Sequence, residues 1–449
     1  MKKNIDMTSG NPINLILSFA VPMFIGNIFQ QVYNITDAAI VGKYVGADAL
    51  ASVGATGTIT FFLVSWLIGF TRGAGVVFAQ YVGSGRPDSM RRALSTLIYA
   101  MFGMTVFISA FGCLISRPFL MLLSTPSDII DTSAMYLRIM FLGTIGSAIY
   151  NVCSVALNSI GDSKTPIYAL ITAAILNIAL DLLFVLKFNM GVNGSGLATI
   201  ISQFISGLIC LGFIIWKQPS LHIKRNEWKF NSIMFKKIVK MGTPNALQSS
   251  LISLGGMSVQ RLVNSCGTVT VAAYTAANKI DSMAIQPIVS LGMAVSVFTA
   301  QNMGANNIDR IKLGLKQTLK VMISSCIVIA LGIVLFRTQL LELFLDKIKD
   351  ADAIRIGGQY LCIVGIAYIS AGIMQTYLNI LKGSGDVNVT MAIGLVELGS
   401  RIFFAYILVL LFKLGSTGIW LSTPLSWITA CVMTVIRYYS GKWKTKSIV

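Results

Sequence analysis

Charged side chains are scarce in this sequence, and acidic ones are scarcer than basic ones. Of the 449 residues only 12% are Asp, Glu, Lys or Arg, with 17 acids against 35 bases. A soluble globular domain carries roughly 25% charged residues. Hydrophobic residues make up 55%, and the mean hydropathy is +0.75. The composition therefore excludes an ordinary water-soluble domain and indicates a protein that is largely immersed in lipid.

Residues that carry most enzyme chemistry are also few. The one histidine, His222, stands in a basic segment where we expect a solvated side chain. The seven cysteines are scattered without a CxxC spacing, so neither disulfide nor metal roles are expected. No Walker P-loop and no Ser–His–Asp arrangement is present in the sequence. We expect neither an enzyme nor a protein with a cofactor, and ATP is not expected to drive this chain by itself.

Long apolar runs dominate instead. Twelve runs reach about 20 residues, the length that a helix needs to cross about 30 Å of hydrocarbon. They cover residues 13–41, 52–80, 93–115, 135–157, 166–187, 195–216, 236–263, 275–302, 317–337, 358–381, 388–412 and 416–438. The sequence therefore predicts an all-α integral membrane protein with twelve transmembrane helices. The first run is too long for the core of a signal peptide and is expected to remain as a span.

The two halves of the chain resemble each other. The repeated pairs are Pro22 and Pro244, Gly46 and Gly267, Gln80 and Gln301, Asp88 and Asp309, Tyr136 and Tyr360, and Gly161-Asp162 and Gly385-Asp386. Many secondary transporters consist of two such repeats, with substrate and ion sites near the membrane midplane where the repeats meet. We therefore predict two pseudo-symmetric lobes of six helices, residues 1–216 and 241–449.

The basic residues lie mainly on one side of the predicted spans. More than half of the 35 fall on the side of the N-terminus, and seven of them stand between Lys217 and Lys240. This is the positive-inside bias that sets membrane topology. It predicts that both termini and a basic linker, residues 217–240, lie in the cytoplasm of a multi-pass plasma-membrane protein. Because topology accounts for the charge, no nucleic-acid partner is expected.

The first span carries polar side chains at helical spacing. Asn27, Gln30, Gln31, Asn34 and Asp37 fall on one stripe, which must face protein or water rather than lipid. Amides can join helices as well as bind ligands, and both roles remain open for Asn27 and Gln30. For Asp37 an ion- or proton-handling role is the stronger interpretation, because an ionisable side chain within a membrane is costly.

The fifth and sixth spans repeat this pattern. Asn177 and Asp181 stand four residues apart, on one helical face. Thr199, Ser202, Gln203 and Ser206 share a face of the next span. Carboxylate, amide and hydroxyl oxygens suit a small cation, and a carboxylate can bind a proton instead. The first half of the chain thus holds a candidate cation or proton site.

The second half lacks acids at the matching places. Val259 stands opposite Asp37 in the repeat, and Ala405 stands opposite Asp181. Glu397 and Arg401 are placed at i and i+4, in the favourable order for a helical ion pair. We interpret this pair as structural. The titratable site is therefore expected in the first half.

These residues together resemble the multidrug and toxic compound extrusion (MATE) family. The resemblance rests on Pro22 with Asp37 in the first span, the Gln80-Tyr-Val-Gly and Gln301-Asn-Met-Gly segments, the Gly161-Asp162 and Gly385-Asp386 pairs, and Asn177-xxx-Asp181. It covers the chain from about Pro12 to Arg437, and its branch is that of the DNA-damage-inducible transporters. The NorM-like branch has a Glu in the seventh span, near Ile252 here, and this departure argues against a cation site in the second half.

The resemblance implies a two-lobe antiporter that exports amphipathic, often cationic, organic compounds in exchange for H⁺ or Na⁺, by alternating access. By matching positions, Asp37, Asn177, Asp181 and Thr199 would form the cation- or proton-binding cluster, and Pro22 the hinge of the first helix. The side chains expected to line the substrate cavity are Gln30, Gln31, Asn34, Gln203, Gln248 and Gln260. The partners are then small organic molecules and the lipid bilayer, no metal beyond Na⁺ is implied, and we expect a monomer.

Two other membrane functions fit the sequence less well than export of small compounds. A flippase for a lipid-linked saccharide or cell-wall precursor would need an Arg-rich cavity for pyrophosphate. The candidate intramembrane bases are few: Arg72, Arg261, Lys279 and Arg401. A channel would need a ring of pore-lining segments, which a two-fold repeat of twelve spans does not supply.

Overall fold

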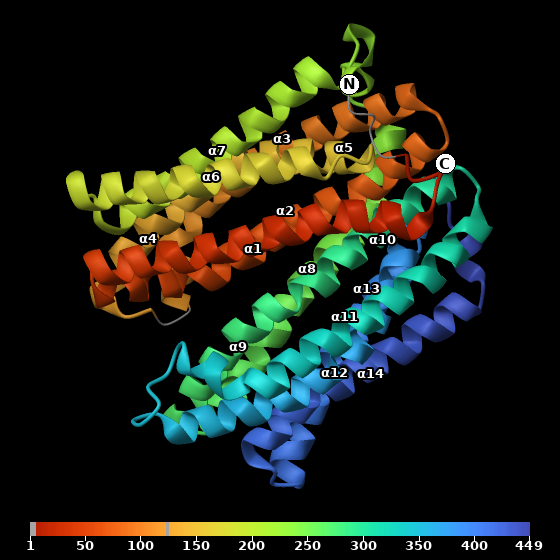
Figure 1. Cartoon of the computed structure of the whole chain (residues 1–449). Helices are drawn as coiled ribbons and strands as arrows, with labels where there is room; N and C mark the ends of the chain where they lie inside the picture. The colour runs from red at the N-terminus through yellow and green to blue at the C-terminus, as the bar shows by residue number, and fades with distance from the viewer. Residues whose placement is uncertain (1–5, 123–124) are drawn as a thin grey trace. The chain divides into compact units, whose positions relative to one another are not determined.

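Helices form the described part of the chain, residues 6–122 and 125–449 of a computed structural model (Figure 1). The first half contains α1 Pro12–Tyr44, α2 Ala47–Gly83, α3 Pro87–Leu122, α4 Ser127–Leu142, α5 Thr144–Ser159, α6 Lys164–Asp181 and α7 Gly191–Lys217. The second contains α8 Ser232–Ser265, α9 Thr268–Ala284, α10 Gln286–Gly304, α11 Ile308–Glu342, α12 Ala351–Ser384, α13 Val387–Tyr406 and α14 Gly415–Tyr439. Short helical turns complete it: η1 Leu182–Lys187, η2 Pro219–Leu221, η3 Arg225–Glu227, η4 Ile407–Leu411 and η5 Lys442–Thr445.

Eleven stretches of the described residues are long and apolar enough to cross a membrane. Two of them join consecutive helices, α4 with α5 in Ser127–Ser159 and α9 with α10 in Thr268–Gly304. Each coincides with one predicted span. The remaining predicted span, 236–263, is formed by α8, a 34-residue helix whose first turns carry Lys236, Lys237 and Lys240. The predicted all-α membrane fold is therefore confirmed, and twelve spanning segments agree with it.

The internal repeat extends to the backbone. The π-helical turns η1 and η4 follow α6 and α13, at matching places in the two halves. Positive φ angles also recur in pairs: Gly46 and Gly267, Gly85 and Asn306, Gly161 and Gly385, Asn189 and Lys413, and Gly191 and Gly415. Left-handed backbone at a residue with a side chain is uncommon. Its occurrence after both π-helical turns, at Asn189 and Lys413, indicates that the two halves share local chain geometry.

The chain divides into two compact units, and the boundaries between them fall within two helices. One unit holds Ile25–Ala246, and the other holds Met7–Phe24 with Leu247–Ile448. The chain thus changes unit within α1, shortly after Pro22, and within α8, shortly after Pro244. The linker 217–240 belongs to the first unit by this division. The lobe boundaries 1–216 and 241–449 stay a prediction.

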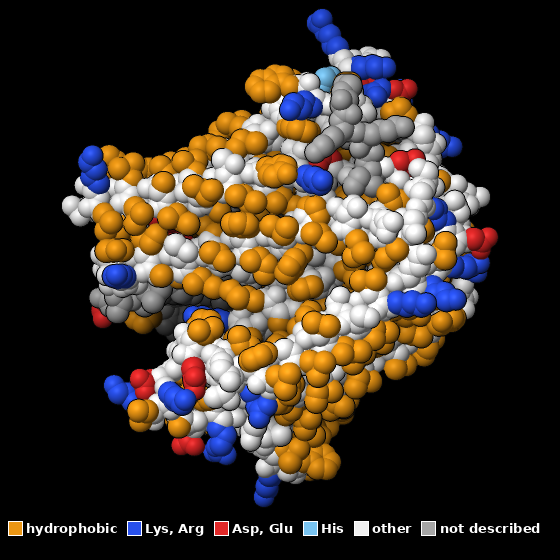
Figure 2. Space-filling view, in the orientation of Figure 1, with side chains coloured by type: hydrophobic (Ala, Val, Ile, Leu, Met, Phe, Trp, Pro, Cys, Tyr) orange, Lys and Arg blue, Asp and Glu red, His pale blue; other side chains and the backbone are white. Residues whose placement is uncertain are grey.

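The outer surfaces of the helices are apolar. Figure 2 shows hydrophobic side chains spread along the helices, with Lys and Arg gathered mostly toward helix ends. On α3 the exposed positions Tyr99, Phe102 and Val106 follow a spacing of three and four residues, which places them on one face. A large exposed apolar surface is expected of side chains that face lipid tails.

Candidate functional site

Asp37 is the acid of α1 that lies at the centre of the candidate site. Its side chain is half-buried, and its Oδ1 accepts a hydrogen bond of 2.8 Å from Ser195 Oγ. Ser195 stands in the second turn of α7 and is fully buried. The bond joins two helices that are 158 residues apart in the sequence. Asp37 is therefore held by a donor that can turn its hydroxyl toward another acceptor.

Asp181 is the last residue of α6 and is completely buried, as is Asn177 one turn earlier. In the orientation that satisfies both ends of the Asn177 amide, its nitrogen donates to Asp181 Oδ2 at 2.8 Å. Its oxygen then accepts from the Thr199 N–H at 3.1 Å. The three predicted residues Asn177, Asp181 and Thr199 thus lie together.

The two carboxyl groups of the site are neighbours. Asp37 and Asp181 interact electrostatically with each other. Asp181 Oδ1 is buried and has no donor in the described part of the chain. Two carboxylates in this arrangement repel each other unless a proton or a cation lies between them. The structure brings together all four residues that the sequence assigned to the cation or proton site.

Three residues of the cluster were not predicted from the sequence. Ser195 binds Asp37, the Tyr33 hydroxyl lies 3.2 Å from Thr199 Oγ1, and buried Tyr136 of α4 interacts electrostatically with both acids. Ser195 and Tyr33 each stand one helical turn before a residue that was identified, so their spacing could have revealed them. No local pattern points to Tyr136.

The local backbone after Asp181 is unusual. The π-helical turn η1 begins at the next residue, Leu182, and ends at Lys187. Such turns in helices are frequent at functional sites, because the extra residue leaves backbone groups less tightly bonded. The position of η1 therefore agrees with a functional role for the end of α6.

The side chains assigned to the substrate cavity fall into both units. On α1, Gln30 donates to Asn34 and Asn34 to Gln31, each at 3.4 Å, and these side chains are partly or fully exposed. Gln203 is half-buried and accepts a hydrogen bond from Ser147 of α5.

In the second unit, Gln248 is buried and packs against Gly394 of α13, where an added Cβ would lie 2.8 Å from Gln248 Cγ. Gln260 donates to Asn264 at 2.8 Å on the same helix. The cavity role of all six polar side chains remains a prediction.

The acids of the second unit are held by other partners. Arg401 Nη2 lies 3.4 Å from Glu397 Oε1, the i to i+4 pair that the sequence predicted. Arg401 Nε also donates to Ser426 of α14 at 3.4 Å. Asp281 of α9 accepts hydrogen bonds from two tyrosines of α12, Tyr360 and Tyr368. The side chain of Ile252 lies outside those that the structure describes.

Pro22 lies within α1, about three turns from its first residue. A proline inside a helix removes one backbone hydrogen bond and permits a kink. The second proline of the pair, Pro244, lies within α8. Both positions agree with the sequence repeat.

The helical spans and the buried acid cluster define a polytopic membrane transporter. The model of the MatE family matches residues 22–183 and 244–407, so its two parts begin at the two prolines. "Probable multidrug resistance protein YoeA" of Bacillus subtilis is 29% identical over 96% of this chain and 94% of its own length.

Solved structures share the fold. One, described as a "Crystal structure of MATE in complex with MaL6", gives a TM-score of 0.93 at 20% identity, over 99% of this chain and 100% of that one. A second, described as "Crystal structure of MATE in the bent conformation", gives 0.91 at 22% identity, with complete coverage of both chains. The chain belongs to the MATE family of membrane transporters, and it is not an enzyme.

Proposed function

We propose that this protein is a secondary active antiporter that exports amphipathic, often cationic, organic compounds in exchange for protons or Na⁺. The observation that carries the proposal is the pair of neighbouring carboxyl groups, Asp37 and Asp181, in the first unit. Asp181 Oδ1 has no donor in the described part of the chain. A proton or a Na⁺ ion bound between the two acids gives this oxygen the partner that it lacks.

The ligand set suits either coupling ion. Asp37, Asp181 and Thr199 offer carboxylate and hydroxyl oxygens from α1, α6 and α7, and Asn177 holds Asp181 through its amide nitrogen. Hard cations prefer such oxygens, and a carboxyl pair can hold a proton in the same place. We assign the four residues to the coupling site, with Ser195 as a donor that orients Asp37.

Ion binding can be coupled to transport through α1. This helix carries Asp37 in the first unit and Pro22 in a segment that belongs to the second. An ion shifts a conformational equilibrium only by its differential affinity for the two states. We infer that a loaded Asp37 favours one shape of α1, with Pro22 as the hinge. A structure with the same fold is described as MATE "in the bent conformation".

The substrate class follows the relatives and the chemistry of the polar side chains. YoeA is named a "probable multidrug resistance protein". Amide side chains such as Gln30, Gln31 and Gln248 offer neutral hydrogen bonds, which suit varied amphipathic compounds. The flippase alternative finds no support in the comparisons. We further propose a monomer in the plasma membrane, with both termini and the linker in the cytoplasm.

The deciding experiment is efflux from proteoliposomes under one imposed gradient at a time. Purified protein is reconstituted with a fluorescent organic cation, and export is followed under a pH gradient or under a Na⁺ gradient. We expect one gradient to drive export in the wild type, and neither to do so in Asp37→Asn. Export without any imposed gradient would refute the antiporter. So would the absence of export under both gradients when several substrates are tested.

A further inference from the structure

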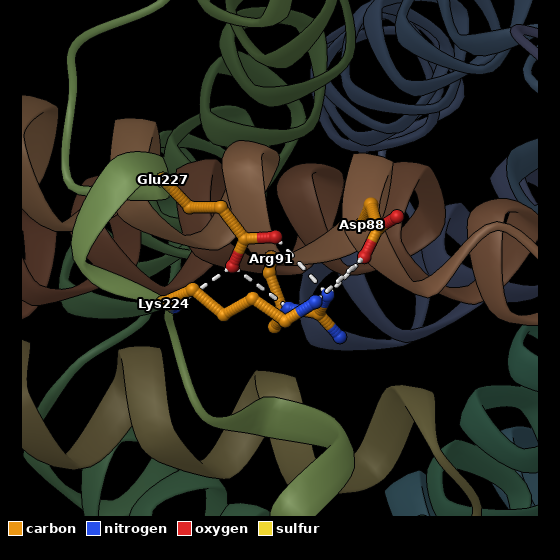
Figure 3. Close-up of polar contacts among 4 residues, drawn as sticks. All are labelled: Asp88, Arg91, Lys224 and Glu227. Atoms are coloured by element: carbon orange, nitrogen blue, oxygen red, sulfur yellow. Dashed lines mark hydrogen bonds and ion pairs between the residues drawn. The ribbon is translucent and has the colours of Figure 1, made fainter.

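A buried ion pair connects the linker 217–240 to α3 (Figure 3). Arg91 of α3 donates from Nε to Glu227 Oε2 at 2.8 Å and from Nη2 to Oε1 at 3.0 Å. The two side chains are only 7% and 4% exposed. The Lys224 N–H also donates to Glu227 Oε2 at 2.8 Å. A two-point Arg–carboxylate contact fixes orientation as well as distance, so the turn η3 is held in one position.

The ion pair neutralises the linker's one acid, Glu227. The exposed basic residues that remain are Lys217, Lys224, Arg225, Lys229, Lys236 and Lys240. Lys224 lies 3.8 Å from Asp88, so its charge is partly balanced. Arg225 and Lys229 stand on either side of Glu227 and form no ion pair within the described residues. The linker therefore presents uncompensated positive charge.

An aromatic contact joins the basic linker to the exposed apolar face of α3. Trp228 follows Glu227 directly, is 47% exposed, and meets Tyr99 of α3 edge to face, with ring centroids 6.5 Å apart. Tyr99 begins the exposed stripe that continues to Phe102 and Val106. Phe230 is 53% exposed. Trp and Tyr favour the headgroup level of a membrane, which suits a linker at the interface between lipid and water.

We propose that this linker surface binds the headgroups of anionic phospholipids in the adjoining leaflet. The linker surface comprises Lys217, Lys224, Arg225, Lys229, Lys236 and Lys240 with the aromatic residues Trp228 and Phe230. Its cations contact the headgroup phosphates, and its rings insert between the headgroups beside α3. The rings alone would favour any phospholipid. The cations add selectivity for negative charge, because each contributes about 1 kcal/mol near an anionic surface.

Lipid-borne quenchers can test the proposal on the full chain. The protein is reconstituted in phosphatidylcholine vesicles that contain a minor amount of brominated phosphatidylglycerol or of brominated phosphatidylcholine. The quenching due to Trp228 is the difference between the wild type and Trp228→Phe. We expect brominated phosphatidylglycerol to quench Trp228 more strongly than brominated phosphatidylcholine does. Added salt should reduce this excess of quenching.

Charge-removing variants identify the residues responsible. In Arg225→Gln/Lys229→Gln the local enrichment of phosphatidylglycerol should fall by about fivefold per residue, the equivalent of about 1 kcal/mol each. The matched control is Lys347→Gln/Lys349→Gln, which removes two exposed cations between α11 and α12 and should leave the excess unchanged. Equal quenching by both lipids would overturn the proposal. So would an excess that survives Arg225→Gln/Lys229→Gln, or one that inorganic phosphate abolishes at constant ionic strength.

Discussion

Ser195 Oγ donates a 2.8 Å hydrogen bond to Asp37 Oδ1, and this bond joins α7 to α1. One turn away on both helices, the Tyr33 hydroxyl lies 3.2 Å from Thr199 Oγ1. The two contacts lie one turn apart on the same faces of the two helices, because residues four apart share a helical face. A change in the charge of Asp37 therefore acts directly on a hydrogen bond between α1 and α7.

Replacing either acid of the coupling site should abolish ion-driven export. In Asp37→Asn and in Asp181→Asn, the amide keeps the shape of the side chain but can neither release a proton nor carry the charge that binds a cation. Expression should change little, because the substitution removes a costly intramembrane charge. Efflux from proteoliposomes measures the effect. Asp309→Asn, at an acid that is 91% exposed, is the control and should export normally. Retained coupled efflux in Asp37→Asn would place the coupling site elsewhere.

Replacing Pro22 should impair transport without preventing insertion. Alanine restores the missing backbone donor and stiffens α1 where the chain changes unit. We expect normal expression and strongly reduced efflux for Pro22→Ala. Pro118→Ala, at a proline within α3, removes a helix proline away from this boundary and should transport normally. Equal activity of Pro22→Ala and the wild type would remove the hinge role.

Removing Glu397 should reduce the amount of folded protein. Glu397 and Arg401 are only 16% and 18% exposed, so Glu397→Gln leaves a partly buried guanidinium uncompensated. Breaking a fully buried pair costs about 3–5 kcal/mol, and the loss here should be smaller. The measurements are expression and thermal unfolding in detergent. The double variant Glu397→Gln/Arg401→Gln should recover most of the loss. A well-expressed but inactive Glu397→Gln would make Glu397 a functional acid.

The contact between Arg91 and Glu227 should stabilise the linker in a pH-dependent way. The hydrogen bond from Arg91 holds the pKa of Glu227 below its ordinary value. Its contribution to stability is therefore complete above the unfolded pKa of about 4.3, and it is lost as the pH falls through the lower folded pKa. At neutral pH, Glu227→Gln should cost less than the about 3–5 kcal/mol of a fully buried pair, because Arg91 keeps its ion pair with Asp88. It should also expose the linker to protease.

Limited proteolysis of the linker as a function of pH measures this effect. The wild type should become sensitive only in strong acid, whereas Glu227→Gln should be sensitive at neutral pH. Asp352→Asn, which loses an exposed pair with Arg355, should match the wild type. Equal resistance of Glu227→Gln and the wild type at neutral pH would contradict the expected role of the ion pair.

The linker should be cytoplasmic. Asn226 is exposed and lies next to Glu227, so a cysteine at this position is accessible from the side on which the linker lies. In a background without the seven native cysteines, an impermeant thiol reagent added to intact cells should not label Asn226→Cys, and it should label it after lysis. Labelling of intact cells would reverse the topology inferred from the basic residues.

Local patterns in the sequence were sufficient for much of the architecture. The twelve spans depend only on apolar length, and the repeat was visible in pairs such as Pro22 and Pro244. The contacts within one helix, Asn177 with Asp181 and Glu397 with Arg401, followed from their spacing of four residues. Helical geometry sets such relationships directly, because residues one turn apart must be neighbours.

Contacts between distant segments were decided only by the tertiary structure. The bond from Ser195 to Asp37 spans 158 residues, and the bond from Arg91 to Glu227 spans 136. Many serines and arginines in the chain have similar local surroundings, and only the packing of whole helices selects which acid each one meets. The change of unit inside α1 and α8 has the same origin. The hydropathy of the sequence indicates which segments lie in the membrane, whereas side-chain packing determines which of these helices contact each other.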